Sequence, residues 1–273
     1  MRPSAGRIFV STAVGTEDTE AAAPTRGSPA RAPLHPPHRV LGVTAVYNEE
    51  SRAEAMGQRL AATGLVDDFV VVNDGSTDRS AEILRAHGVH VLDQAHLGLG
   101  AAIKHAVRHA RANGYTVLVL FAGNGKDDPK EIPRVLAPIV AGTADYVQGS
   151  RYLPGGSHEN TPLFRLVAIR CLSWLFSAYM GKRCTDLTNG FRAYRVALLE
   201  DPRINIDQAW LDNYEYEYYV HWYAYKLGYR VAEVPVSKTY PSARGVAYSK
   251  IRPVTGWWRM LRPFVFLALR IKK

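Results

Sequence analysis

Two stretches of the sequence decide the fold: Val40-Leu-Gly-Val-Thr-Ala-Val-Tyr-Asn-Glu-Glu50 and Val70-Val-Val-Asn-Asp-Gly-Ser-Thr-Asp78. Each begins with β-branched and other apolar residues and ends in polar ones, which is the pattern of a buried strand that runs into a loop. An amphipathic stretch follows each of them, at 50–63 and 76–87, and predicts a helix. The two stretches therefore predict consecutive strand–helix units.

The same alternation continues along the chain. The expected strands are 40–46, 69–72, 89–92, 116–121 and 146–149, and the expected helices are 50–63, 76–87, 100–113 and 129–141. Strands that alternate with helices predict an α/β fold with a mostly parallel sheet and helices on both faces. In such a sheet the ligand lies beyond the carboxyl ends of the strands.

The charge of the chain is concentrated near its end. The 273 residues carry a formal net charge of +9, and eight of the 34 Lys and Arg residues fall between Arg244 and Lys273, where Asp and Glu are absent. With 47% hydrophobic and 22% charged residues, the chain has too much apolar material to be disordered throughout. Because the rest of the chain is nearly neutral and contains no nucleic-acid motif, we do not expect a nucleic-acid partner.

Composition also divides the chain. Residues 1–39 are rich in Ala, Pro and Arg and are expected to form a flexible extension, 40–252 the main domain, and 253–273 an amphipathic basic helix. Neither a signal peptide nor an apolar run of about 18 residues is recognisable, so we expect no transmembrane helix. Cys171 and Cys184 are too few for a disulfide framework and are expected to be reduced thiols of a cytoplasmic protein.

Polar residues follow successive strands and predict a site at one edge of the sheet. They occupy the loops 47–50, 73–78, 122–129 and 149–151. Ser76 and Asp78 also suit the start of a helix, so capping explains part of the second loop. Capping does not explain why Glu49, Asp74 and Arg151 occur together, and we interpret these loops as an active-site rim.

Several motifs resemble those of a known family. Val43-Thr-Ala-Val-Tyr-Asn-Glu-Glu50 and Val71-Val-Asn-Asp-Gly-Ser-Thr-Asp78 resemble the opening of family 2 glycosyltransferases, which have the GT-A fold. The later motifs resemble the polyprenyl-phosphate (dolichol-phosphate) mannose synthase branch; they are Gly149-Ser-Arg-Tyr152, Thr185-Asp-Leu-Thr-Asn-Gly-Phe-Arg-Ala-Tyr-Arg195, Glu233-Val-Pro-Val236 and Ser249-Lys-Ile251. The resemblance covers about 40–252, with the motifs in family order.

The resemblance implies an enzyme that transfers a hexose, with inversion, from a nucleotide-diphosphate sugar to a polyprenyl phosphate. It also implies a mostly parallel nucleotide-binding sheet sandwiched by helices, with C-terminal amphipathic helices. By position in the motifs, Tyr47, Asn48 and Glu49 would hold the nucleobase and ribose, and Asp74 the nucleoside, with Asn73 beside it. The donor nucleotide (GDP, UDP or dTDP) is left open.

Basic residues match phosphate-binding positions of the family. They are Arg151, Arg165, Arg244 and Lys250, of which Arg151 is assigned to the donor, Arg165 to the acceptor, and Arg244 and Lys250 to the acceptor phosphate and to catalysis. Guanidinium and ammonium groups stabilise the negative charge of a departing diphosphate.

The acceptor decides whether a base is needed. A phosphate acceptor is already a nucleophile, whereas a hydroxyl needs a carboxylate to take its proton. Asp186 ranks first for that role, ahead of Asp212, Glu215 and Glu217.

One departure from the family concerns the metal. The family's Asp-x-Asp, which holds Mg²⁺ or Mn²⁺ on the diphosphate, reads Ala122-Gly123-Asn124 here. A divalent cation on a diphosphate prefers anionic oxygen ligands, and these residues supply none. Three interpretations stay open. Asp127 or Asp128 holds the metal near Asn124, Lys126 replaces the metal as counter-charge in the donor site, or the protein binds sugar nucleotides without catalysis.

Two apolar segments near the carboxyl end bear on the acceptor. They are 164–180, with Arg165 and Arg170, and 257–271, with Arg259, Arg262 and Arg270. On a helical wheel the arginines of the second segment fall near one side, opposite Trp258, Leu261, Val265 and Leu269. Such a helix suits a membrane interface, although a helix packed on the sheet has the same pattern. The sequence thus indicates a cytoplasmic enzyme on the membrane surface, with transfer to a hydroxyl of a soluble metabolite or glycan as the alternative.

Overall fold

A computed structural model of the chain describes residues 38–61, 64–122, 125–240 and 255–272. Of the predicted site residues, Asn124, Arg244 and Lys250 lie outside these ranges, as does the predicted extension up to residue 37.

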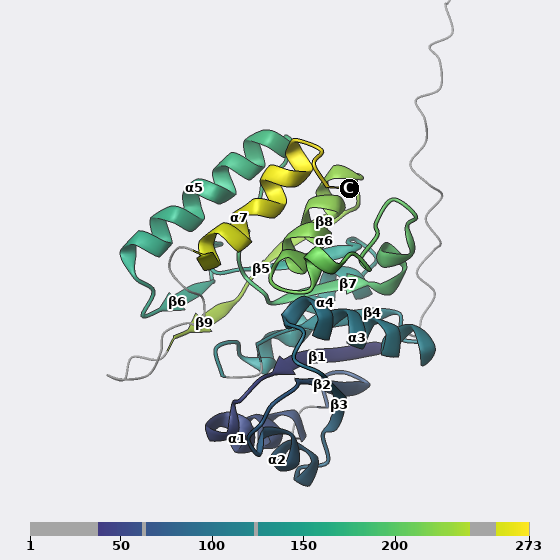
Figure 1. Ribbon diagram of the computed structural model, residues 1–273. Coiled ribbons are helices and arrows are strands. Elements are labelled where there is room, and N and C mark those ends of the chain that lie inside the picture. The colour runs from purple at the N-terminus through teal and green to yellow at the C-terminus, as the bar shows by residue number, and fades with distance from the viewer. Residues whose placement is uncertain (1–37, 62–63, 123–124, 241–254, 273) are drawn as a thin grey trace, which may run out of the picture. The chain divides into compact units, whose positions relative to one another are not determined.

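The centre of the fold is a seven-stranded sheet with the order β3-β2-β1-β4-β7-β5-β8 (Figure 1). Its strands are β1 (Val40–Val46), β2 (Asp68–Asp74), β3 (His90–Gln94), β4 (Val117–Leu120), β5 (Tyr146–Ser150), β7 (Arg192–Arg195) and β8 (Val231–Pro235). All neighbours pair in parallel except β7, which is antiparallel to both β4 and β5. The mostly parallel sheet predicted from the sequence is therefore confirmed. A separate two-stranded parallel sheet joins β6 (Ser157–Glu159) to β9 (Ser237–Thr239).

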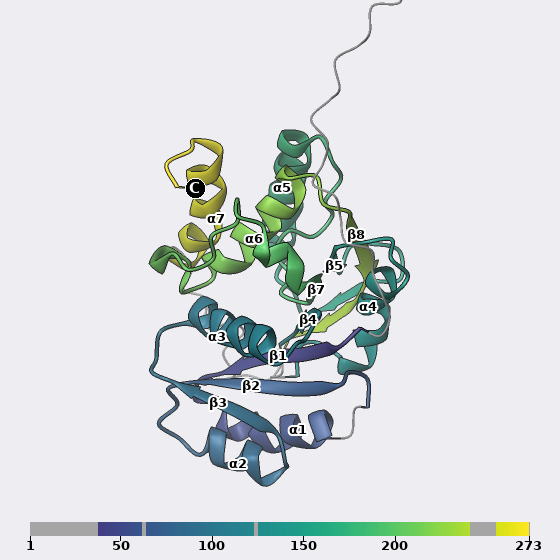
Figure 2. The same ribbon diagram turned by 90° about the vertical axis from the view of Figure 1, so that its right-hand side faces the viewer.

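Helices cover both faces of the large sheet (Figure 2). On one face lie α1 (Glu50–Ala61), α2 (Ser80–Ala86) and α4 (Ile132–Val140), and on the other α3 (Leu99–Ala112) and α6 (Glu215–Lys226). The alternation within strands explains this arrangement, because Val71 joins the core on the first face while Val70 and Val72 join the core on the second.

The predicted helices differ from the observed ones by more than a residue or two in two places. Residues 129–141 form a short 3₁₀ turn, η1 (Pro129–Glu131), followed by α4. Residues 76–79 form a loop, and α2 starts only at Ser80. Two further 3₁₀ turns, η2 (Val196–Glu200) and η3 (Ala209–Leu211), connect the later elements.

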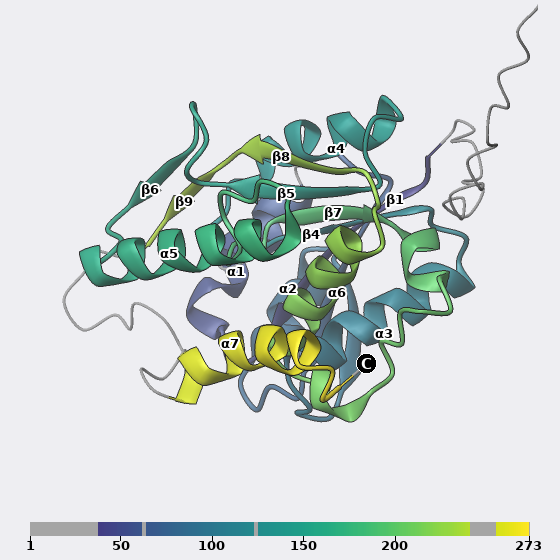
Figure 3. The ribbon, with the colours of Figure 1, turned by 90° about the horizontal axis from the view of Figure 1, so that it is seen from above.

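Two more helices, α5 (Leu163–Met180) and α7 (Thr255–Ala268), flank α6, as the view in Figure 3 shows. Phe264 of α7 touches Phe176 of α5, with ring centroids 5.5 Å apart. Phe264 also touches Tyr218 of α6 at 5.4 Å. Aromatic contacts of this kind join the three helices into one layer.

The structure bears on two expectations about these helices. First, α5 is long and apolar enough to cross a membrane by length and composition, with a mean hydropathy of 1.4. Arg165 and Arg170 interrupt the apolar run of α5, so the run alone does not predict a membrane-spanning helix. Second, Arg262 does not belong to a basic surface stripe, because its guanidinium forms an ion pair with the fully buried Glu215 of α6.

Candidate active site

The loops after β1 and β2 are tied together at the carboxyl edge of the sheet. Asn48 has a left-handed φ of 49°, a conformation that Asn tolerates well, and its side-chain oxygen accepts a hydrogen bond from Thr77 N at 2.9 Å. The N–H of Asn48 donates to Ser76 Oγ at 3.0 Å, and the N–H of Glu50 donates to Asp78 Oδ2 at 3.0 Å. The polar residues of the second loop thus join two strand ends, which is why α2 begins later than predicted.

An aromatic pair lies beside these loops. The Tyr47 ring stacks on the His96 ring, with centroids 3.9 Å apart and an interplanar angle of 17°. The carboxylate of Asp74 contacts His96 Nδ1 at 2.9 Å and accepts hydrogen bonds from the N–H groups of Leu97 and Gly98. Asp74 is buried, and these contacts hold the loop after β3 in place. The rings stay partly exposed and offer the kind of flat surface on which a nucleobase stacks.

The neighbouring polar residues are also held by the protein. Glu49 is buried and forms an ion pair with Arg52 at 2.5 Å. Asn73 donates to Asp93 Oδ1 at 2.9 Å and accepts from Ser76 N at 3.1 Å. This part of the site is therefore ordered in advance by contacts within the chain, which reduces the entropy lost on binding.

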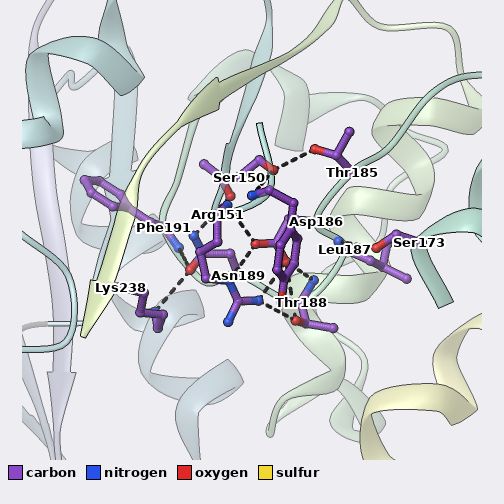
Figure 4. A network of polar contacts seen from close by, with 12 residues as sticks. Ser150, Arg151, Ser173, Thr185, Asp186, Leu187, Thr188, Asn189, Phe191 and Lys238 are labelled. Carbon is purple, nitrogen blue, oxygen red and sulfur yellow. Dashed lines mark hydrogen bonds and ion pairs between the residues drawn. The ribbon is translucent and has the colours of Figure 1, made fainter. Parts of the chain in front are cut away.

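Further along the sheet edge, Arg151 and Asp186 form a buried ion pair (Figure 4). Arg151 Nε lies 2.6 Å from Asp186 Oδ2, and Nη2 lies 2.7 Å from Oδ1, so the pair is bidentate. The guanidinium also donates to Thr188 Oγ1 at 2.8 Å and to the hydroxyl of Tyr240 at 3.0 Å. The side chains of the pair are 1% and 0% exposed.

This geometry argues against Asp186 as a base. Burial by itself raises the pKa of Asp186, but the charge and hydrogen bonds of Arg151 outweigh it and leave the pKa below its usual value. A carboxylate that binds protons weakly and has no solvent contact is poorly suited to accept one from a substrate hydroxyl. Its position instead makes Asp186 the anchor of Arg151.

The segment that carries Asp186 is fastened to the sheet. Glu233 of β8 accepts hydrogen bonds from Thr185 N at 2.7 Å and from Asp186 N at 3.2 Å. Burial raises the pKa of Glu233, although the two N–H groups act in the opposite direction. Asn189 donates to the carbonyl of Gly149 at 3.0 Å. These bonds fix the ion pair relative to the end of β5.

Asp127 is another buried carboxylate of the edge. Its Oδ1 lies 2.6 Å from Lys238 Nζ, and its Oδ2 accepts a hydrogen bond from Ala122 N at 2.7 Å. Lys238 also donates to Asn189 Oδ1 at 3.1 Å, and the side chain of Asp127 is 0% exposed. Asp128 has another task, because its carboxylate accepts from Lys130 N and caps η1.

These residues do not fit a divalent cation held by carboxylates. Both oxygens of Asp127 are already engaged by an ammonium group and an amide, and Asp128 caps a helical turn. In the described part of the chain, His, Cys, Asp and Glu side chains form no group of three that could bind a metal ion. Asn124, the remaining metal candidate, lies outside the described residues.

Cations gather around the ring of Tyr240 instead. Lys126 Nζ lies 5.8 Å from the ring centroid and Arg165 Cζ lies 5.5 Å from it, while Arg151 donates to the hydroxyl. Burial, followed by the charge of Lys238, lowers the pKa of Lys126. The arrangement is an electropositive patch, which suits phosphate groups.

The other carboxylates considered as bases are mostly engaged elsewhere. Asp212 forms an ion pair with Lys104 at 2.6 Å, and Glu215 pairs with Arg262. Glu217 packs against Gly190, so closely that a Cβ at this glycine would lie 3.0 Å from its carboxylate oxygen. None of these contacts involves Arg151 or Lys126.

Sequence reasoning predicted most residues of this edge but left four of them without a role. Lys238, Tyr240 and Glu233 had no assigned role, although Glu233 belongs to one of the family motifs. Their position at or just after β8, the last strand of the large sheet, is the signal that could have identified them. His96 likewise follows the end of β3.

The mostly parallel sheet flanked by helices, with polar side chains at its carboxyl edge, fits the GT-A fold of glycosyltransferases. The model of the family described as "Glycosyl transferase family 2" matches residues 43–201, more than half of the chain. The chain belongs to this family and is a glycosyltransferase.

Curated relatives and solved structures agree with this assignment. Polyprenol monophosphomannose synthase of Mycolicibacterium smegmatis is 32% identical over 76% of this chain and 80% of its own length. Undecaprenyl-phosphate mannosyltransferase of Micrococcus luteus is 34% identical over 73% of this chain and 83% of its own. Glucosyl-3-phosphoglycerate synthase of Mycobacterium tuberculosis, solved with Mn²⁺, UDP and glucosyl-3-phosphoglycerate, is 18% identical, with a TM-score of 0.60 over 85% of this chain and 79% of that one. That similarity shows the shared fold.

Proposed function

We propose that the protein transfers a hexose, with inversion, from a nucleotide-diphosphate sugar to a polyprenyl phosphate. The observation that carries the proposal is the engagement of Asp186, the first-ranked base, by Arg151. A phosphate oxygen attacks without giving up a proton, so such an acceptor does not require that base. The names of the M. smegmatis and M. luteus relatives support the same acceptor class.

The donor is assigned to the edge formed by the first two loops and the cationic patch. The nucleobase would stack at Tyr47 and His96, with Asn48, Glu49 and Asp74 shaping the pocket around it. The diphosphate would lie toward Lys126, and Arg165, which is assigned to the acceptor by its place in the sequence, flanks the same Tyr240 ring. Arg151 is the rigid support of this patch, because its guanidinium holds the hydroxyl of Tyr240.

The reaction is a single displacement at the anomeric carbon of the sugar. An oxygen of the polyprenyl phosphate forms a bond to that carbon, while the bond between the carbon and the diphosphate oxygen breaks. The electron pair of the broken bond leaves on the diphosphate, so the products are a polyprenyl phosphohexose and a nucleoside diphosphate. The cations of the patch would stabilise the charge that grows on the diphosphate. Arg244 and Lys250, which lie outside the described residues, are assigned to the acceptor phosphate by their place in the family motifs.

A transfer assay tests this function. The protein is incubated with radiolabelled GDP-, UDP- and dTDP-hexoses and a short polyprenyl phosphate, and the lipid phase is counted. Each reaction is run with Mn²⁺, with Mg²⁺ and with EDTA, because the M. tuberculosis neighbour was solved with Mn²⁺. Label in the lipid phase with at least one donor is expected. Transfer to a soluble hydroxyl acceptor but not to the lipid phosphate would contradict the proposal.

We also propose that the enzyme works at the surface of an anionic membrane. Helix α5 exposes several large apolar side chains: Leu163, Phe164, Val167, Trp174, Leu175 and Tyr179. Trp258, Val265 and Leu269 do the same on α7 and just after it. Arg170, Arg270 and Lys272 are exposed on the same two helices and the residues just after α7. Apolar and aromatic side chains beside basic ones suit a bilayer with anionic headgroups, where the polyprenyl acceptor resides.

Vesicle flotation tests this second proposal. The full chain is expected to float with vesicles that contain phosphatidylglycerol, and less with pure phosphatidylcholine. Replacement of Phe164 and Trp174 by Ser should weaken flotation, because each side chain is more than two-thirds exposed and contributes little to folding. Val140→Ser is the control, since Val140 is an exposed apolar residue on α4. A full chain that stays unbound with anionic vesicles would contradict membrane docking.

A further inference from the structure

The charges at the donor edge do not fit an arrangement in which a divalent cation, held by carboxylates, neutralises the diphosphate of the donor. The described charged groups that act on Lys126 include the cations of Lys238, Arg52 and Arg165 and the carboxylate of Glu49. Lys238 is matched by Asp127 and Arg52 by Glu49, each at a distance below 3 Å. Within the described ranges Lys126 forms no ion pair with a carboxylate. The edge therefore contains an ammonium group for which the described part of the chain provides no direct counter-charge.

The backbone places this ammonium group at the edge. Lys126 accepts a hydrogen bond at its carbonyl from Thr239 N at 3.0 Å, and the next residue, Asp127, forms an antiparallel bridge with Lys238. The ion pair between Asp127 and Lys238 is buried. The backbone contacts and this ion pair together fasten the Lys126 segment to β9. Such a support limits the freedom of the segment and leaves the ammonium group beside the Tyr240 ring.

The same ion pair removes a carboxylate that a metal would need. A divalent cation would have to displace Lys238 from Asp127, which would leave a buried ammonium group unpaired at high cost. Ala122 has no oxygen in its side chain, and Asn124 would supply at most a neutral one. The chain thus lacks anionic ligands at the positions of the family's metal motif and has a lysine two residues beyond it.

We propose that the Lys126 ammonium group, supported by the Asp127–Lys238 ion pair and Tyr240, serves as the counter-charge of the donor diphosphate in place of a divalent cation. This inference rests on the proposed function, because it assumes a nucleotide-diphosphate donor. Lys126 would donate hydrogen bonds to the diphosphate oxygens and stabilise the negative charge left there when the anomeric bond breaks. An ammonium group can act as a point charge on phosphate. In metal-dependent members of the family, the divalent cation neutralises the same charge.

Nucleotide binding measured by calorimetry tests the proposal without relying on transfer. The full chain is titrated with GDP, with UDP and with dTDP, in EDTA and in Mn²⁺. For the nucleotide that binds, Kd is expected to differ less than about threefold between the two conditions, since no charge-assisted ligand is lost. Lys126→Ala should weaken binding by about tenfold or more in EDTA, the loss expected for a hydrogen bond to a charged group. Lys126→Arg should retain most of the affinity.

Controls separate this effect from misfolding and from general electrostatics. Lys130→Ala removes an exposed lysine of the same segment and should leave Kd within about twofold. Guanosine, uridine and thymidine lack phosphates, so their binding should be unaffected by Lys126→Ala. The melting temperature of each variant reports whether it folds, and Lys126→Gln provides a second neutral replacement.

Two outcomes would overturn the proposal. One is a gain of tenfold or more in nucleotide affinity when Mn²⁺ replaces EDTA in the unmodified protein. The other is an unchanged Kd in folded Lys126→Ala and Lys126→Gln. Failure of the proposed function has a different signature, in which none of the three nucleotides binds under any condition, or a nucleotide binds but no hexose reaches the lipid phosphate.

Discussion

Replacement of Asp186 by Asn tests whether this carboxylate positions Arg151 or acts as a base. The substitution keeps the size of the side chain but removes its charge, and it turns one acceptor oxygen into an amide donor that faces the guanidinium. Arg151 would then be a buried cation without its partner, because its side chain is 1% exposed and its bidentate contacts to Asp186 are 2.6 and 2.7 Å long. The expected result is a large loss of stability.

The size of that loss follows from the burial of the pair. Removing one partner of a buried ion pair costs about 3–5 kcal/mol, and each kcal/mol lowers the melting temperature of a domain of this size by about 2–4 °C. The melting temperature of Asp186→Asn should therefore fall by about 6–20 °C, measured by circular dichroism or calorimetry. Glu82→Gln is the control, since Glu82 pairs with Arg79 on the surface, where both side chains are about two-thirds exposed. That change should alter stability by less than about 0.5 kcal/mol.

A double variant separates loss of the pair from the unpaired charge. Arg151→Met combined with Asp186→Leu removes both charges, and it should be more stable than Asp186→Asn by about 2 kcal/mol or more, because no isolated charge is left in the interior. The reasoning would be refuted if Asp186→Asn melted within about 2 °C of the unmodified protein while losing all transfer activity. That pattern is what a general base, rather than a support for Arg151, would produce.

Three other changes probe the rest of the molecule. Burial, and next the charge of Arg192, hold the pKa of His221 well below its usual value, so only the unfolded chain gains a proton as the pH falls below about 6.5. The free energy of unfolding should fall by about 1.4 kcal/mol from this group between about pH 7.5 and 5.5, and His221→Gln should remove that part of the slope in urea titrations. An unchanged slope would show that His221 does not contribute. Arg262→Met should destabilise the fold by about 2–4 kcal/mol, because it leaves the buried Glu215 unpaired. Adding Glu215→Gln should recover part of this loss in the same urea titrations. No recovery would contradict the pairing. Tyr47→Ala should weaken nucleoside diphosphate binding by about 0.5–1.5 kcal/mol in calorimetry, and Tyr47→Phe should not; equal losses would exclude stacking as the cause.

Much of the fold was accessible to sequence reasoning because the signals were local. The strand at 40–46 was predicted with the bounds that the structure shows, since its apolar run ends abruptly at Tyr47. The helix at 76–87 was predicted four residues too early. Its first residues have good capping chemistry, but they are used to bind the loop after β1, and that loop is close only in the folded chain.

Part of the candidate site could be predicted from the sequence. The alternation of strands and helices implied that the loops after β1, β2, β4 and β5 meet at one edge, and the motifs assigned residues to that edge. The antiparallel insertion of β7 between β4 and β5 was not expected. It brings the segment of Asp186 beside Arg151, and no periodicity of the sequence encodes which strand lies next to which.

The sequence by itself determined the alternation of strands and helices, the two-sided burial of the sheet and the loss of the metal motif at Ala122 and Asn124. Only the tertiary structure decided which charges meet. Asp127 and Lys238 are 111 positions apart, and Asp186 and Arg151 are 35 apart, yet both pairs are buried at the same edge. The physical reason is that burial patterns arise from the local period of a helix or strand, whereas the neutralisation of a buried charge depends on the order of the strands that surround it.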